Sequence, residues 1–121
     1  KPQHERIFKK LTQVIIDNNQ GLVFTAVDCT NSLQAAVLLV LHKNRLTGII
    51  NTSSLAGKKH CASHFLFDQI IQKFAGSDYL LDFEGSSIAT IARFYEGFGA
   101  SEELFFQYKN TLLKKISQRF S

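Results

Sequence analysis

Residues 92–100 read ARFYEGFGA and combine the end of a helix with a glycine stop. Just upstream, Gly85-Ser86-Ser87 supplies residue types that are favoured at helix N-caps. Gly97 and Gly99 are of the type that closes helices at the C-terminus. The sequence therefore predicts a helix over residues 88–96.

The segments before this helix alternate between strand and helix patterns. Residues 79–83, YLLDF, are typical of a short central strand. Over residues 60–75, Ala62, Leu66, Ile70 and Phe74 recur every four positions, and further apolar residues (Phe65, Phe67 and Ile71) widen the face. This spacing predicts a buried helix that stops at Gly76.

The first half of the chain predicts a helix followed by three antiparallel strands. Residues 4–18 carry apolar side chains at helical spacing. Residues 22–28, 33–42 and 45–52 are rich in β-branched and aromatic residues. Residues 33–42 could be helical by propensity, but the turn-like Lys43-Asn44 and the Ile-rich return favour a strand.

The remaining elements are a strand over residues 103–109, ELFFQYK, and an amphipathic helix over residues 111–120. A meander followed by strand–helix crossovers predicts an α+β fold. Its sheet is expected to be mixed but mostly antiparallel, with helices on both faces.

This order of elements resembles the GNAT-type acyltransferases (the acyl-CoA N-acyltransferase fold) with their first strand and helix missing. ARFYEGFGA is similar to the late-helix pattern of that family, in which a Tyr is followed four residues later by Gly. Two features resemble the FemAB-like variant of the family. One is the short strand sequence YLLDFEG at residues 79–85, and the other is the helix ending marked by Phe94, Phe98 and Gly99. The resemblance implies an N-acyltransferase that moves an acetyl, acyl or aminoacyl group to a small-molecule or peptide amine.

The resemblance also implies roles for three residues. Tyr95 matches the phenol that protonates a departing thiolate as a general acid; the alternative is that it packs with Phe94 and Phe98. Asp82 and Glu84 alternate on a predicted strand, so they are expected on one face, where they could orient or deprotonate an amine. The alternative for them is capping of the next helix. Arg93 could stabilise an oxyanion, or simply be a solvated helix residue.

Residues 53–59, SSLAGKK, are expected to form a small-residue loop that admits the pyrophosphate of acetyl-CoA or another acyl-CoA at a helix N-terminus. The Q/R-x-x-G-x-G/A signature of the family is incomplete here, because Lys59 stands where a second glycine is usual. FemAB-like proteins use other donors, so aminoacyl-tRNA is an alternative. The expected cofactor-binding residues are Leu55, Ala56, Gly57, Lys58, Lys59 and His60.

One helix face would carry His60, His64 and Asp68, because they fall at i, i+4 and i+8. These side chains could hold a metal, or they could simply form a polar edge of the helix. Without a further ligand motif, no metal site is expected. Cys61 has no Cys-His-Asn context and is expected to be a packing residue.

Composition sets the remaining expectations. The 121 residues are 45% hydrophobic, which suits one domain with one core. The net charge is +4, but the lysine pairs are scattered, so nucleic acid is not expected as a partner apart from tRNA as an acyl donor. Two cysteines and no long apolar stretch favour a cytoplasmic protein without a membrane span.

The chain begins at Lys1 and contains no Met, so it is expected to be the C-terminal part of a longer protein. Two alternatives to the enzyme follow from the sequence. The domain could be a non-catalytic lobe with a structural, binding or dimerisation role, and the dimer would be a homodimer. It could also be a module that binds an anion or nucleic acid.

Overall fold

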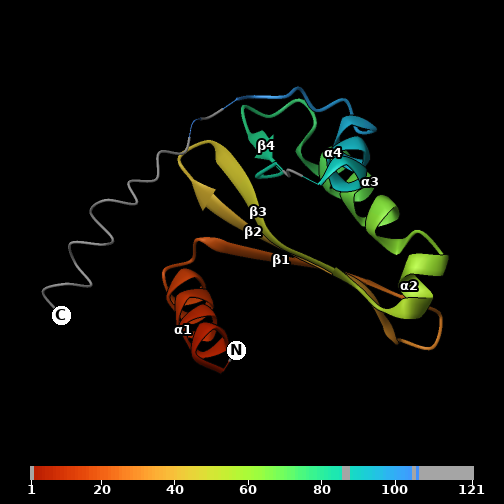
Figure 1. The fold of residues 1–121 in the computed structure, drawn as a ribbon, viewed down its shortest axis with the longest axis horizontal. Coiled ribbons are helices and arrows are strands. Elements are labelled where there is room, and N and C mark those ends of the chain that lie inside the picture. Colours follow the sequence, from red (N-terminus) through yellow and green to blue (C-terminus); the bar gives the residue numbers. More distant parts are fainter. Residues whose placement is uncertain (1, 86–87, 105, 107–121) are drawn as a thin grey trace, which may run out of the picture.

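A computed structural model of the chain describes residues 2–85, 88–104 and 106 (Figure 1). Within these residues it contains helices on both sides of a four-stranded sheet. The elements in chain order are α1 (Pro2–Asp17), β1 (Gly21–Val27), β2 (Leu33–His42), β3 (Arg45–Ser53), α2 (Leu55–Lys59), α3 (Ala62–Phe74), β4 (Leu80–Asp82) and α4 (Ala89–Glu96).

The sheet has the strand order β1-β2-β3-β4. β1 pairs antiparallel with β2 and β2 antiparallel with β3, whereas β3 and β4 are parallel. The predicted meander is confirmed, including the strand over residues 33–42 and the turn at Lys43, whose φ of 54° is left-handed. The prediction of an α+β fold with a mixed sheet is confirmed as well.

The core lies between α3 and one face of the meander. Val37, Leu39 and Leu46 point from the strands into this layer and are almost fully buried. Phe67 and Ile70 meet them from α3. The predicted four-residue spacing is confirmed at the buried residues Ala62, Leu66 and Ile70, but Phe65 is exposed and does not widen the buried face.

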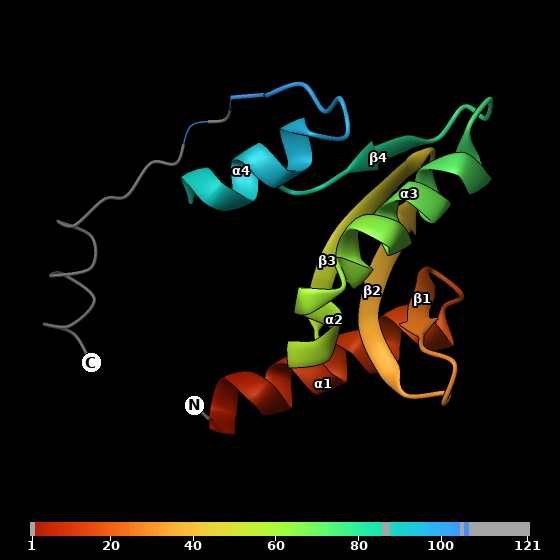
Figure 2. The same cartoon turned by 90° about the vertical axis from the view of Figure 1, so that its right-hand side faces the viewer.

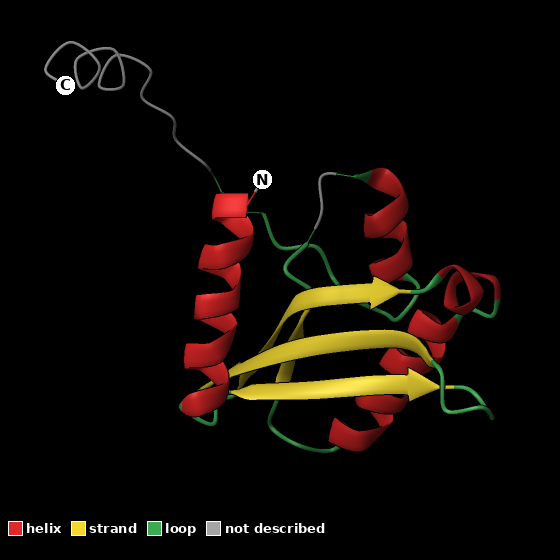
Figure 3. Ribbon diagram, turned by 90° about the horizontal axis from the view of Figure 1, so that it is seen from below, coloured by secondary structure: helices red, strands yellow, loops and turns green. Residues whose placement is uncertain are grey.

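Among the described residues, the opposite face of the sheet is covered only at one end. Figure 1 shows α1 below the sheet and α2, α3 and α4 above it. Ile15 is the buried residue of α1. Its side chain and that of Leu38 both lie within 4 Å of the position that a Cβ on Gly21 would take. Figure 3 shows α1 lying beside the strand ends rather than across the sheet. Ile7 and Leu11 of α1 are therefore more than half exposed.

The predicted loop over residues 53–59 is wrong, because most of it forms the short helix α2. Ser54 caps this helix by accepting a 2.9 Å hydrogen bond from the Gly57 N–H. A Cβ on Gly57 would lie 2.0 Å from the carbonyl oxygen of Gln34 on β2. Glycine at this position therefore serves the close approach of α2 to the sheet.

The predicted helix over residues 88–96 is present as α4, but its N-cap differs. The cap residue is Ile88, and its side chain makes no capping hydrogen bond within the described residues. Of the predicted strand over residues 103–109, the described residues 103, 104 and 106 are not in a strand, and the others lie outside the described residues. The predicted helix over residues 111–120 also lies outside them. No helix in the described part of the chain is long and apolar enough to cross a membrane.

Candidate functional site

A pocket of about 510 Å³ opens where β3 and β4 separate. The two parallel strands pair over only three positions, from Arg45 with Leu80 to Thr47 with Asp82. β3 then continues to Ser53, while the chain after β4 leads away to α4, as Figure 2 shows. Side chains from β3, α2, α3, α4 and the segment after β4 line the space left between them. Its volume lies in the range of about 300–1,000 Å³ that small-molecule sites occupy.

A β-bulge in β3 decides which side chains face this pocket. Leu39 pairs with Gly48 and Leu38 with Ile50, so Ile49 is the extra residue. An extra residue shifts the alternation of side chains by one position. Asn51 therefore lies on the same face of the sheet as the core residue Leu46, and it lines the pocket. In a regular strand Asn51 would lie on the opposite face.

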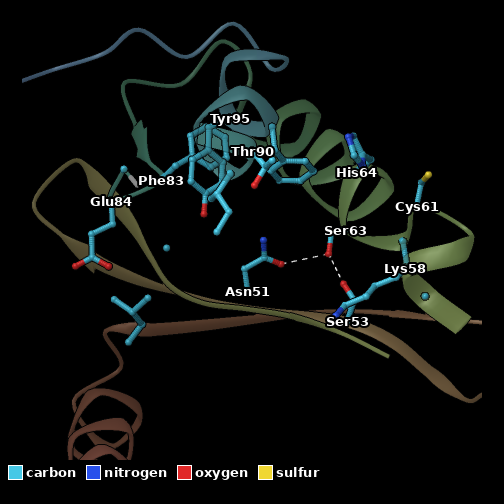
Figure 4. Close-up of a pocket in the computed structure, with 17 residues that line it drawn as sticks. Asn51, Ser53, Lys58, Cys61, Ser63, His64, Phe83, Glu84, Thr90 and Tyr95 are labelled. Carbon is cyan, nitrogen blue, oxygen red and sulfur yellow. Dashed lines mark hydrogen bonds between the residues drawn. The ribbon is translucent and has the colours of Figure 1, made fainter. Parts of the chain in front are cut away.

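Three polar side chains form a connected line across the floor of the pocket (Figure 4). The Ser63 hydroxyl, in the first turn of α3, donates to Asn51 Oδ1 at 3.3 Å. The hydroxyls of Ser53 and Ser63 are 2.5 Å apart. The line joins the end of β3 to the start of α3.

Tyr95 lies on the α4 side of the pocket. Its ring stacks on Phe83, with centroids 4.6 Å apart and planes inclined by 22°. Burial raises the pKa of the Tyr95 phenol, a side-chain hydrogen bond with Asn51 partly offsets this, and the charge of Glu84 adds to it. The phenol is therefore protonated throughout the neutral range. Tyr95 therefore packs against the rings of Phe83 and Phe94, and it also lines the pocket.

Asp82 and Glu84 have different surroundings. Glu84 lies beyond the end of β4 with a left-handed φ of 65°, and it lines the pocket. Asp82 is the last residue of β4 and is not among the pocket residues. Its Oδ2 accepts from the Arg45 guanidinium at 2.7 Å, and its Oδ1 accepts from the Glu84 N–H at 2.8 Å. Asp82 thus holds the turn that presents Glu84, and the two carboxylates do not share one strand face.

The end of the pocket away from Glu84 is formed by α2 and the start of α3. Figure 4 shows Lys58, Cys61 and His64 at this end and Tyr95 between it and Glu84. Among the six residues expected to bind a cofactor, Gly57 and Lys58 line the pocket. The other four do not, namely Leu55, Ala56, Lys59 and His60.

The residues considered for a metal are not brought together. His60 caps the C-terminus of α2, whereas His64 and Asp68 belong to α3, so the helix face assumed from their spacing is broken at Cys61. The His64 ring contacts Phe94 edge-on at 4.4 Å. Within the described residues no group of three His, Cys, Asp or Glu side chains could hold a metal ion.

Cys61 was expected to be a packing residue, but it is exposed. Its thiol is exposed at the pocket, and its φ of 54° marks the break between α2 and α3. Arg93 is exposed and does not line the pocket, which fits the solvated alternative.

Asn51 and Ser63 were not predicted as site residues from the sequence, and Ser53 was predicted only as the first residue of the pyrophosphate-binding loop. The available signal was the polar pair Asn51 and Ser53, two positions apart and directly after the apolar residues Ile49 and Ile50. Such a pair shares one face of a strand. The bulge that turns this face to the pocket has no sequence signature beyond the glycine at position 48.

Comparison with known proteins adds no assignment. No family model matches the chain, and no curated protein or solved structure is significantly similar to it. The pocket and the residues that line it are therefore the features that bear on function.

Proposed function

We propose that the chain is an N-acyltransferase that moves an acyl group from an activated donor to an amine in the pocket between β3 and α4. The observation that carries this proposal is the order of groups along the pocket. A carboxylate, Glu84, lies at one end, a protonated phenol, Tyr95, in the middle, and an ammonium, Lys58, at the other end.

This order suits a reaction between a cationic acceptor and an anionic donor. Glu84 would attract an ammonium and take a proton from it. Lys58 would attract the phosphates of an acyl-CoA. α3 supports the same end, because Cys61, Ala62, Ser63 and His64 line the pocket and the start of a helix favours anions.

The proposed transfer forms one bond and breaks another. The amine nitrogen attacks the acyl carbon, so that a C–N bond forms and the C–S bond of the thioester breaks. Before the attack, Glu84 takes one proton from the ammonium and releases it to solvent, which leaves a free amine. After the attack, Glu84 accepts the second proton that the nitrogen loses, and Tyr95 donates its proton to the departing thiolate. Proton exchange with solvent returns Glu84 and Tyr95 to their starting states. The products are an amide and a free thiol.

Binding of the donor is tested by thermal denaturation with acetyl-CoA. The proposal expects the midpoint to rise with ligand concentration, because a ligand that binds only the folded chain stabilises it. No rise at millimolar acetyl-CoA excludes the coenzyme A version. The aminoacyl-tRNA version is then tested by transfer of a labelled amino acid from charged tRNA to an amine.

A second candidate is a non-catalytic lobe that pairs with another copy of the chain. The observation in its favour is the exposed apolar side of α1 and β1, where Leu11, Val14 and Val23 are each more than half exposed. Light scattering should then detect a dimer that Leu11→Glu dissociates, whereas the matched variant Lys10→Glu does not. A monomer at all concentrations tested would remove this candidate.

A further inference from the structure

In the hydrogen bonds along the floor of the pocket, the donor and the acceptor of each bond can be assigned. Ser63 donates its only hydroxyl hydrogen to Asn51 Oδ1. The hydroxyls of Ser53 and Ser63 are in contact at 2.5 Å, and either could donate. Because the Ser63 hydrogen is already used, Ser53 must be the donor of this pair.

The same reasoning extends to the other side of Asn51. A primary amide has one oxygen acceptor and one NH₂ donor group, so an amide whose oxygen faces Ser63 turns its nitrogen the other way. Figure 4 shows the Asn51 nitrogen on the side of the Tyr95 hydroxyl. Asn51 and Tyr95 form a side-chain hydrogen bond, and the orientation of the amide makes Asn51 its donor.

We propose that Ser63 and Asn51 are positioning residues that make Tyr95 a hydrogen-bond donor toward the pocket. With its oxygen accepting from the Asn51 amide, the phenol O–H is free to point at the bound ligand. This inference rests on the proposed function for the identity of the accepting atom, the leaving sulfur. The direction of the hydrogen bonds does not depend on it.

The opposite direction is a real alternative. If the Asn51 amide were turned over, its NH₂ would donate to Ser63 and its oxygen would accept from the phenol. The Tyr95 hydrogen would then be held by the protein and withdrawn from the ligand. The two arrangements have opposite effects on the phenol, because a donor stabilises the phenolate and an acceptor stabilises the neutral form.

The test is a titration of Tyr95 in the full chain with Tyr79→Phe and Tyr108→Phe, which leaves one tyrosine in a protein that has no Trp. Tyrosinate absorbance reports the ionisation directly. A fluorinated tyrosine, whose phenol ionises at lower pH, keeps the titration within the range where circular dichroism shows a folded chain. Glu84 is the charged group that acts on Tyr95, so it is unchanged in every variant.

The expected result is that Asn51→Ala, Asn51→Leu and Ser63→Ala each raise the pKa of Tyr95. Ser63→Thr, which keeps the hydroxyl, should leave it unchanged. Thr52→Ala should also leave the pKa of Tyr95 unchanged, because Thr52 is an exposed residue of β3 outside the pocket. Ser63→Ala should have no further effect in an Asn51→Leu background, because Ser63 acts through the amide.

A fall of the Tyr95 pKa in Asn51→Ala and Asn51→Leu would overturn the inference, since it would show that the amide accepts from the phenol. An effect of Ser63→Ala that persists without Asn51 would overturn the role of Ser63. Acyl transfer is measured separately. The expected titrations without any transfer would leave the hydrogen-bond direction standing and remove the proposed function.

Discussion

The guanidinium of Arg45 donates to Asp82 Oδ2 at 2.7 Å, and this ion pair joins β3 to β4 beside the pocket. It spans the only three positions at which the two parallel strands pair within the described residues. Asp82 also accepts from the Glu84 N–H, so the same carboxylate holds the strands together and shapes the turn that carries Glu84. The pocket geometry therefore depends on a residue that does not line it.

Arg45→Gln should lower the free energy of unfolding by about 0.5 to 1 kcal/mol, because both side chains of the pair are partly exposed. The matched control is Lys9→Gln, which breaks the more exposed pair with Glu5 on α1. That control should change stability by less than the Arg45 variant. Urea denaturation of the two variants checks this, and equal losses would mean that the Arg45 pair has no special role.

Gly57→Ala should destabilise the fold by about 3 kcal/mol or more, because the added methyl group cannot fit against the backbone of Gln34. The matched control is Gly76→Ala. Gly76 has a φ of 75° with no atom within 4 Å of an added Cβ, so only the backbone conformation is strained and the cost should be about 1 kcal/mol. Chemical denaturation distinguishes the two. A smaller loss at Gly57 than at Gly76 would contradict the packing of α2 on β2.

Lys58→Ala should weaken the binding of acetyl-CoA roughly tenfold, the size expected for loss of one charged hydrogen bond. Lys59→Ala is the matched control, because Lys59 is the next residue and does not line the pocket. Isothermal titration of both variants provides the measurement. If both variants bind equally weakly, the effect is general electrostatic attraction and not a contact in the pocket.

The raised pKa of Tyr95 predicts a decline of stability in alkali. The folded chain holds the phenol proton to higher pH than the unfolded chain, whose tyrosine ionises near 10. The folded state therefore binds more protons in this window, and the free energy of unfolding falls as pH rises through it. Tyr95→Phe should reduce this fall, as measured by denaturation at several values of pH. An unchanged decline would show that other groups cause it.

Much of the fold was predictable because local patterns agreed with the tertiary environment. The apolar strand over residues 33–42 is buried on both sides along its middle, and Lys43 accepts the left-handed turn that the hairpin needs. In α3 the spacing of Ala62, Leu66 and Ile70 matches the face that meets the sheet.

The candidate site was only partly predictable, because it depends on irregular backbone. The bulge at Ile49 turns Asn51 to the pocket, and the left-handed residues Cys61 and Glu84 redirect the chain at its two ends. No periodic pattern encodes such positions. Tyr95, Glu84 and Lys58 were found through the resemblance to an enzyme family. Asn51 and Ser53 offered only their two-residue spacing near the end of β3, and Ser63 offered no signal.

The central claim is most directly tested by thiol release from acetyl-CoA in the presence of a panel of primary amines, with wild-type protein and Tyr95→Phe. The account predicts amine-dependent release that falls about 100-fold in the variant, the lower end of what a general acid contributes. Release at the same rate by both proteins, or none above the protein-free rate with wild type, would contradict it.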